Sequence, residues 1–272
     1  MAKRRVAVVT GGARGLGLAI AQAFAREHTD LVIADIDEET GKRTRDQIRA
    51  SGVSAEYFRC DVSRREDVQA MTGFALKAFD RIDILVNNAG IGPLGPFLEV
   101  PFETWSQVLA VNLSGAFLCG QSVAAAMARQ GRGRIVNIAS ISGIRAGFGR
   151  SAYGTSKAAV IQLTKQMAVE LAPLGITVNA VAPGPVDTDL AMKHHTPEMR
   201  ADYHSMIPMA RYGTADEIAD AVAFLCGDKA TYINGQVLCV DGGFVAAGVG
   251  VTTARTQRVA SPASADEAPE SD

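Results

Sequence analysis

A regular alternation of short apolar runs and helical patterns is the feature that most constrains the fold of this chain. Apolar runs typical of buried strands lie at residues 6–9, 31–34, 55–59, 84–86, 135–139, 176–181 and 236–240. Helical patterns lie between them, the first beginning at the glycines after the first strand and the others at residues 38–50, 64–79, 102–129, 152–171 and 215–226. Strands that alternate with helices pair in parallel. The sequence therefore predicts an α/β fold, a single-domain doubly wound parallel sheet with helices on both faces.

Composition narrows the class of protein and its partners. The 272 residues are 47% hydrophobic and 21% charged, which suits one globular domain, expected at residues 1–251. The net charge of -2 provides no general attraction to nucleic acid or to an anionic membrane. Residues 252–272 have few apolar side chains and several charges, so we expect this tail to be disordered.

Neither a targeting segment nor a membrane span is expected. The apolar run after the basic start of the chain is only about five residues long, and no apolar stretch approaches the roughly eighteen residues of a membrane helix. We therefore expect a cytoplasmic protein. The cysteines have no C-x-x-C spacing and no histidine at metal-ligand spacing, so each is predicted to be a small core residue and no metal site is predicted. They are Cys60, Cys119, Cys226 and Cys239.

Glycine and polar residues gather where the predicted strands end. The carboxyl ends of parallel strands meet at one edge of the sheet, and ligands bind beyond that edge. These residues are therefore expected to line one site. They are Gly11, Asp35, Asp61, Asn87–Gly90, Ser140 and Pro183–Gly184.

The first predicted strand runs directly into a glycine-rich turn that opens a helix. Its spacing is Gly-x-x-x-Gly-x-Gly, which differs from the G-x-G-x-x-G of the usual dinucleotide fingerprint. Glycines allow the backbone to approach a pyrophosphate, and the helix start offers N–H groups and the positive end of its dipole. A plain tight turn is the alternative for the glycines alone. The residues predicted to bind a dinucleotide here are Gly11, Arg14, Gly15, Leu16 and Gly17.

Asp35, at the end of the second strand, favours NAD over NADP. It lies near the twenty-residue offset at which an acidic group accepts a hydrogen bond from the adenosine ribose. A 2'-phosphate about 4 Å from this carboxylate would meet roughly 4 kcal/mol of repulsion per pair of unit charges at an effective dielectric of 20. Arg14 is the one feature that points toward NADP, and an exposed basic residue cannot remove the carboxylate. The alternative is that Asp35 is a turn residue, although Asp37 could cap the next helix instead.

Tyr153 and Lys157 are the predicted centre of the chemistry. They are four residues apart on a predicted helix, so they share one face about one turn apart, and Ser140 ends the strand before it. A phenol with a pKa of about 10 releases its proton near neutrality only if its phenolate is stabilised by roughly 4 kcal/mol. That stabilisation of the phenolate requires a partly buried ammonium and a further positive charge, such as an oxidised nicotinamide. The alternatives are an ordinary helix pair, and Ser142 in place of Ser140.

In order and spacing, these motifs resemble the classical short-chain dehydrogenase/reductase family from about Lys3 to Gly243. The resemblance implies a Rossmann-type dehydrogenase that exchanges a hydride between a nicotinamide and a carbonyl or secondary alcohol carbon. Tyr153 would be the general acid/base, Lys157 would lower its pKa and hold the nicotinamide ribose, and Ser140 would bind the substrate oxygen. Asn112, within the predicted helix 102–129, would hold a water that links Lys157 to solvent, or could simply bond locally to backbone.

The resemblance also implies further cofactor contacts and an assembly. Asp61 and Val62 would lie by the adenine, and Asn87 and Asn88 would join strands and line the cofactor site, with Asn87 nearer the ribose. The backbone of Val186 and the hydroxyl of Thr188 would hold the nicotinamide carboxamide. The family usually forms a homotetramer through the helices that contain Phe102 and Tyr153 and through the last strand. The remaining cofactor-binding residues implied are Ala89, Gly90, Pro183 and Gly184.

Residues 189–211 break the pattern and are predicted to form a mobile lid over the substrate. Adjacent His194 and His195 do not indicate a metal site, because neighbours on a helix point about 100° apart and no other ligands join them. We expect an NAD-dependent enzyme acting on a small secondary alcohol or ketone. Lys193, Arg200 and residues 129–134 keep 3-oxoacyl-thioester reduction open as a rival. A dinucleotide-binding sensor without turnover is a rival of another class.

Overall fold

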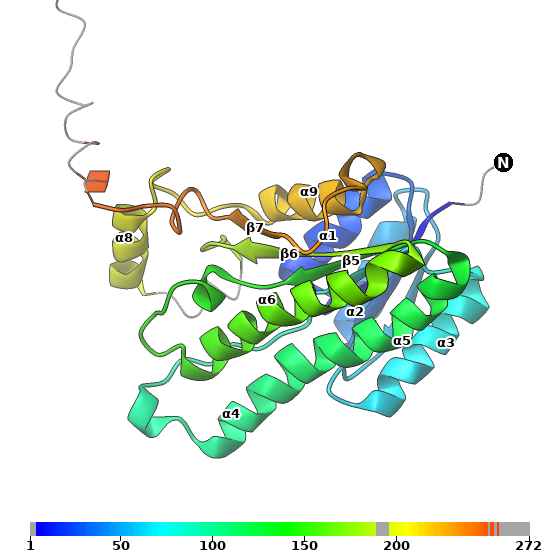
Figure 1. Ribbon diagram of the computed structural model, residues 1–272, viewed down its shortest axis with the longest axis horizontal. Helices are drawn as coiled ribbons and strands as arrows, with labels where there is room; N and C mark the ends of the chain where they lie inside the picture. Colours follow the sequence, from blue (N-terminus) through cyan, green and yellow to red (C-terminus); the bar gives the residue numbers. More distant parts are fainter. Residues whose placement is uncertain (1–3, 189–195, 250, 253–254, 256–272) are drawn as a thin grey trace, which may run out of the picture.

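The computed structural model describes residues 4–188, 196–249, 251–252 and 255, and within them seven parallel strands form one sheet (Figure 1). The strands are β1 (Val6–Thr10), β2 (Asp30–Asp35), β3 (Ala55–Arg59), β4 (Ile84–Asn87), β5 (Gly133–Ile138), β6 (Ile176–Pro183) and β7 (Val237–Val240). Their order across the sheet is β3-β2-β1-β4-β5-β6-β7, with every neighbouring pair parallel. The predicted doubly wound sheet is confirmed. The strand order reverses between β1 and β4, where such sheets bind ligands.

Helices cover both faces of the sheet, which is why the central strands are apolar on both sides. The helices are α1 (Gly15–Arg26), α2 (Glu38–Arg49), α3 (Arg65–Phe79), α4 (Phe102–Leu109), α5 (Gly115–Gln130), α6 (Ser151–Leu171), α8 (Pro197–Met206) and α9 (Ala215–Cys226). One apolar core joins α1, α2 and α9 to the sheet, and the other joins α3, α5 and α6 to its opposite face. In Figure 1, α1 and α9 lie together on one side of the strands and α5 and α6 lie on the other.

The junction of β5 and α6 carries the predicted chemistry. All six residues of β5 are buried, as its apolar sequence predicts. A 3-10 turn, η3 (Ile141–Gly143), follows the strand. Helix α6 then runs for 21 residues without a glycine after Gly154, and it ends just before Pro173, which cannot continue a helix. The end of the strand and the start of the helix are thereby held close together.

Residues 102–130 form one helical stretch interrupted by a π-helical turn, η2 (Ala110–Ser114). By length and composition alone this stretch of 29 residues could cross a membrane, although 44% of its most apolar window is buried within the protein. The expectation that no apolar stretch approaches that length was wrong. Apolar residues lie on more than one side of this stretch. One side packs on the sheet through residues such as Val123, while Phe102 and Phe117 are exposed on another.

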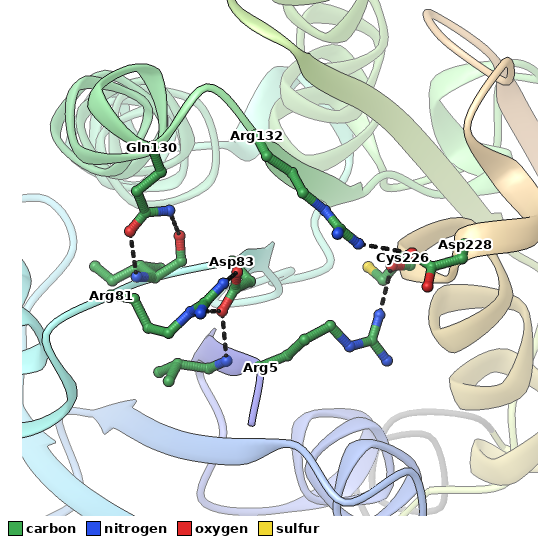
Figure 2. A network of polar contacts seen from close by, with 9 residues as sticks. Arg5, Arg81, Asp83, Gln130, Arg132, Cys226 and Asp228 are labelled. Atoms are coloured by element: carbon green, nitrogen blue, oxygen red, sulfur yellow. Dashed lines mark hydrogen bonds and ion pairs between the residues drawn. The ribbon is translucent and has the colours of Figure 1, made fainter. Parts of the chain in front are cut away.

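Ion pairs hold the opposite, amino-terminal edge of the sheet (Figure 2). Asp83, just before β4, is 4% exposed and accepts hydrogen bonds from the Val6 backbone N–H at 2.8 Å and from two guanidinium nitrogens of Arg81 at 2.8 and 2.5 Å. Arg132, between α5 and β5, pairs with Asp228 just after α9 at 2.6 Å. These contacts join β1, β4, β5 and α9 at the end of the sheet away from the predicted site.

The predicted elements are present, and their boundaries differ from the structure by only a few residues. The predicted lid did not include a helix, but α8 forms within it. Residues 189–195, with both histidines, and nearly all of the predicted tail lie outside the described residues. Three cysteines are buried as predicted, whereas Cys239 on β7 is only half-buried, because this strand is at the edge of the sheet.

Candidate active site

Tyr153 and Lys157 lie one turn apart on α6, as their spacing predicts. The Lys157 Nζ is 5.7 Å from the centroid of the Tyr153 ring. The lysine is 4% exposed, and its Nζ donates a hydrogen bond to the Ile138 carbonyl oxygen at the end of β5 at 2.7 Å. Burial lowers the pKa of Lys157 to about 8, because desolvation penalises its charged form. An ordinary exposed helix pair would show neither the burial nor this change in pKa.

Ser140 meets the Tyr153 phenol across the junction of β5 and α6. Ser140 is 8% exposed, and its hydroxyl forms a hydrogen bond with the Tyr153 side chain. The sequence pattern indicates extended chain here, with Ser142 as a rival on the other side. The chain instead turns through η3, so that the Ser142 backbone N–H donates to the Ser140 Oγ at 3.1 Å. The structure therefore favours Ser140 as the hydroxyl beside the phenol.

The surroundings of the Tyr153 phenol act in opposite directions on its acidity. Burial raises the pKa of Tyr153 above its usual value, and the hydrogen bond with Ser140 and the charge of Arg150 offset this only in part. The expectation that Lys157 lowers this pKa is therefore not borne out by the protein alone, in which the phenol is less acidic than usual. The Arg150 guanidinium carbon lies 5.4 Å from the centroid of the Tyr153 ring. The sequence interpretation missed Arg150, because a basic residue just before a helix is usually solvated. Its position three residues before the tyrosine was the available signal.

Asn112 lies in the π-helical turn η2 and is 2% exposed. Its Oδ1 accepts a hydrogen bond from the Ile91 N–H at 2.8 Å, and its Nδ2 donates to the Ile91 carbonyl and the Ser156 Oγ, both at 2.9 Å. These are not the local helix bonds of the alternative interpretation. They join the loop after β4 to α6, and π-helical turns are frequent at functional sites. The water relay to Lys157 stays a prediction.

The glycine turn between β1 and α1 closes against the end of β4. A Cβ at Gly17 would lie 2.1 Å from the Gly11 carbonyl oxygen, and a Cβ at Gly11 would lie 2.8 Å from the Ala89 Cα. The Asn88 Nδ2 donates to the carbonyl oxygens of Thr10 and Gly11 at 3.0 and 2.9 Å. Both positions therefore require glycine, because any side chain would push the two segments apart.

The start of α1 fits the pyrophosphate of a nicotinamide dinucleotide. Gly15 has a φ of +54°, and a Cβ there would meet nothing within 4 Å, so there is open space beside this backbone. Arg14, at the N-cap, supplies no side-chain cap, and the first turn carries no acidic residue. A phosphate could therefore accept hydrogen bonds from the first turn and benefit from its dipole. Leu16 packs against the core and anchors this turn.

Asp35 ends β2, is half-buried and also holds the glycine turn. Its Oδ2 accepts from the Ala13 N–H and its Oδ1 from the Asp37 N–H, each at 3.0 Å. A carboxylate has about four lone-pair sites, so Asp35 can accept from a ribose as well. Asp37 caps α2 by accepting from the Thr40 N–H. Arg14 pairs with Asp37 at 3.5 Å, and its side chain is 73% exposed.

The two asparagines at the end of β4 have different roles. The Asn87 Nδ2 donates to the Asn137 Oδ1 at 2.8 Å and to the Ala116 carbonyl oxygen at 3.3 Å, and Asn87 is 6% exposed. It therefore joins β4 to β5 and α5, as the resemblance implies. Its expected place nearer the ribose does not fit this position. Because side chains alternate along a strand, Asn88 is the one that faces the glycine turn.

The remaining predicted residues after β3 and β4 also lie at strand ends. Asp61 accepts from the Ser63 N–H and hydroxyl at 3.0 and 2.6 Å, which shapes the turn after β3, and Val62 is buried. The Ala89 N–H donates to the Thr10 Oγ1 at 3.1 Å. A Cβ at Gly90 would lie 3.2 Å from the Asn112 Oδ1 and 3.6 Å from the Lys157 Nζ. Gly90 therefore lies close to both η2 and α6.

The segment after β6 contains the residues predicted to hold the carboxamide. Pro183 is the last residue of β6, and a Cβ at Gly184 would lie 2.7 Å from the Asp241 Cα, so this turn packs closely on the segment after β7. Val186 pairs with Gly213 in an isolated parallel bridge. Thr188 is the last described residue before the gap at residues 189–195.

At one edge, the sheet thus carries a phenol, a hydroxyl and a buried ammonium beside a glycine turn that fits a pyrophosphate. A phenol that hydrogen-bonds a hydroxyl can exchange a proton with an oxygen placed between them, and a nearby ammonium stabilises the phenolate. Within the described residues, no group of three or more histidine, cysteine or acidic side chains is arranged to hold a metal ion. The arrangement suits proton transfer at an alcohol or carbonyl oxygen.

Comparison with known proteins places this arrangement in a family. A family model described as enoyl-(acyl carrier protein) reductase matches residues 11–245. The chain is 43% identical over 247 residues to 2-(R)-hydroxypropyl-CoM dehydrogenase of Xanthobacter autotrophicus, a match that covers 89% of this chain and 99% of that protein. It is 39% identical over 240 residues to the 3-oxoacyl-(acyl-carrier-protein) reductase FabG of Aquifex aeolicus, covering 88% and 96%.

Solved structures agree. An NAD+-bound xylitol dehydrogenase superposes with a TM-score of 0.84 at 33% identity, and the match covers 89% of this chain and 100% of that one. The family model spans the glycine turn, the sheet from β2 onward and the segment that carries Ser140, Tyr153 and Lys157. The chain therefore belongs to the classical short-chain dehydrogenase/reductase family of oxidoreductases.

Proposed function

We propose that this enzyme interconverts a secondary alcohol and a ketone with NAD as its cofactor and Tyr153 as its general acid/base. The observation that carries the proposal is the position of the Tyr153 phenol, hydrogen-bonded to Ser140 and one turn from the buried ammonium of Lys157. The names of its relatives support an oxidoreductase for hydroxyl or oxo compounds, since they include dehydrogenases of 2-(R)-hydroxypropyl-CoM and of xylitol.

The residues divide the reaction between them. In alcohol oxidation, the Ser140 hydroxyl hydrogen-bonds the substrate oxygen and Tyr153, as phenolate, takes the proton of the substrate hydroxyl. The nicotinamide dinucleotide, when bound, supplies the acceptor for the hydride that leaves the carbinol carbon. In ketone reduction, Tyr153 returns the proton to the oxygen. Lys157 stabilises the phenolate electrostatically, and its charge is worth more in this buried site than at the surface.

The preference for NAD is supported by Asp35. Its carboxylate is held by two backbone N–H groups at the end of β2, so it is fixed in place beside the glycine turn. A 2'-phosphate brought to this position would be repelled. Arg14, the residue that would favour NADP, points into solvent and pairs with Asp37. The NAD+-bound xylitol dehydrogenase relative is consistent with the same preference.

Reduction of 3-oxoacyl thioesters is the second candidate, and the relative FabG favours it. The basic loop at residues 129–134 lends it no support. Arg132 pairs with Asp228 at the amino-terminal edge of the sheet, and Arg134 is 7% exposed at the start of β5. The length of β5 separates this loop from Ser140, which follows the other end of the strand, so the loop cannot guide an acyl carrier to the phenol of its own subunit.

We also infer that the enzyme forms a homotetramer. The support is a set of exposed apolar side chains on the helices that the family uses for assembly, with Phe102 74% exposed, Phe117 43% exposed and Val169 75% exposed. Covering such side chains in a subunit interface removes apolar area from water. Sedimentation equilibrium tests this inference, and a monomer at micromolar concentration would contradict it.

The experiment that tests the proposed function is a substrate panel with both cofactors. Secondary alcohols and 3-oxoacyl thioesters are assayed by absorbance of the reduced nicotinamide. We expect turnover of small secondary alcohols with NAD, at a kcat/KM at least about tenfold above that with NADP, since roughly 1.4 kcal/mol corresponds to tenfold. Preference for NADP in the wild type would refute the role of Asp35. Tight dinucleotide binding without turnover of any compound would favour the alternative that the protein is a non-catalytic dinucleotide-binding sensor.

An Asp35→Asn variant makes the cofactor test sharper. Asparagine keeps one oxygen that can accept from the Ala13 N–H, so the glycine turn keeps this contact while the negative charge is lost. Its amide nitrogen cannot accept from the Asp37 N–H, so a small fall in melting temperature is expected. The preference for NAD should fall by about tenfold. Glu56→Gln, a change of charge on the neighbouring strand β3, serves as the matched control and should leave the preference unchanged.

A further inference from the structure

Arg150 holds its guanidinium against the ring of Tyr153. It is the N-cap residue of α6, and its carbonyl oxygen accepts a hydrogen bond from the Gly154 N–H at 2.6 Å. Its own N–H donates to the Gly147 carbonyl oxygen at 3.3 Å. Both sides of the residue are therefore fixed by backbone bonds. The side chain is half-buried, and its guanidinium carbon lies 5.4 Å from the centroid of the Tyr153 ring.

The charged and titratable groups around the phenol are few within the described residues. Lys157 approaches from the next turn of α6, at 5.7 Å from the ring, and Tyr203 approaches from α8. Two other arginines in this region contact other side chains. Arg145 stacks on Phe244 and donates to its carbonyl oxygen at 2.8 Å, and Arg200, also from α8, pairs with Asp187 at 2.7 Å and stacks on Tyr212.

Lys157 and Arg150 differ in the pH range over which they stay positively charged. Burial lowers the pKa of Lys157 to about 8, so without a bound ligand its ammonium is largely lost in mildly alkaline solution. Arginine stays protonated at every pH at which a protein is folded. The Arg150 guanidinium is therefore the cation beside Tyr153 whose charge does not depend on pH, and a cation at this distance favours the phenolate over the phenol.

We propose that Arg150 is a positioning residue for the general base, whose permanent positive charge stabilises the Tyr153 phenolate during proton transfer. The inference rests on the proposed role of Tyr153. It adds a residue to the pair on α6, because Lys157 alone would support the phenolate less as the pH rises. Arg150 does not touch the substrate oxygen in this account, and it acts through the ring on which it stacks.

The test compares Arg150→Gln, Arg150→Lys and the control Arg145→Gln in alcohol oxidation across pH. Loss of the cation makes the phenolate less stable, so the rising limb of the profile of kcat/KM should move to higher pH by about one unit in Arg150→Gln. Arg150→Lys should restore most of the shift. Arg145→Gln removes an equal charge five residues away and should leave the limb in place. A limb that stays at its wild-type pH in Arg150→Gln would overturn the inference.

A second measurement needs no substrate and separates this inference from the proposed function. The absorbance of tyrosinate is titrated in wild type and Tyr153→Phe, and in Arg150→Gln with and without Tyr153→Phe. The difference within each pair reports Tyr153 alone. Its midpoint should lie about one unit higher without Arg150, and equal midpoints would overturn the inference. If the midpoint moves but Tyr153→Phe retains full turnover, the electrostatic contact stands and the proposed function fails.

Discussion

Removal of the buried ammonium should make the cofactor-free protein more stable at neutral pH. Lys157 is 4% exposed, and burial lowers its pKa from 10.5 to about 8. The folded state therefore disfavours the charged form by about 3 kcal/mol at pH 7, at 1.36 kcal/mol per pKa unit. Lys157→Met removes this penalty but leaves the Ile138 carbonyl oxygen without its donor, at a cost of about 1–2 kcal/mol. A net gain of about 1–2 kcal/mol is expected.

The sign of the effect should change with pH. Between pH 8 and 10.5 the unfolded wild type binds a proton at Lys157 that the folded protein lacks, so the stability of the wild type rises with pH through this window. Below pH 8 both states bind the proton and the full penalty remains. Lys157→Met has no titrating group at this position, so it lacks this pH-dependent penalty. Its advantage should therefore shrink above pH 8 and reverse near about pH 9.5, where the lost hydrogen bond outweighs the remaining penalty.

Urea unfolding followed by circular dichroism measures this difference at matched protein concentration between pH 7 and 10. Lys165→Met is the control, because Lys165 lies on the same helix but is exposed, so this variant measures the effect of the same substitution outside the buried site. Other titrating groups cancel in the difference between variant and wild type. A difference that is constant across this range, or that grows in favour of Lys157→Met as the pH rises, would refute the account of the buried ammonium.

Two further substitutions separate cofactor binding from stability. Gly17→Ala places a Cβ against the Gly11 carbonyl oxygen and should weaken NADH binding by at least about tenfold in fluorescence titration. Gly73→Ala, with open space at its Cβ, is the control and should leave NADH binding unchanged. Equal affinities of the two variants for NADH would refute the close packing of the turn. Asp83→Asn breaks the contact with Arg81 and should lower the free energy of unfolding by about 2 kcal/mol. Its kcat and KM should stay within about twofold of wild type. A large loss of turnover would contradict a purely structural role for this edge of the sheet.

The sequence predicted the sheet and the proximity of Ser140 to Tyr153 because both depend on local patterns. Apolar runs mark buried strands, and the carboxyl ends of parallel strands must share one edge, which brings Ser140 to the start of α6. The spacing of Tyr153 and Lys157 then fixes their common helical face. Each of these inferences needs only a few neighbouring residues and the rule that the strands are parallel.

Other features depend on tertiary contacts that no short pattern encodes. The π-helical turn at Asn112 is held by bonds to Ile91 and Ser156, which lie 21 and 44 residues away in the sequence. The stacking of Arg150 depends on how the chain enters α6. Asn87 and Asn88 look alike in sequence, and only the alternation along β4 decides which one faces the glycine turn. The apolar character of residues 102–130 was underestimated because the few polar residues within it break the run.

The central claim is that the Tyr153 hydroxyl carries the proton in hydride transfer. Tyr153→Phe removes that oxygen and keeps the ring, so NADH should bind with a Kd within about threefold of wild type in fluorescence titration. The kcat for the best secondary alcohol should fall by about a thousandfold, in the range typical of a lost general acid/base. If Tyr153→Phe keeps more than about a tenth of the wild-type kcat while binding NADH normally, the phenol is not the acid/base and the account is wrong.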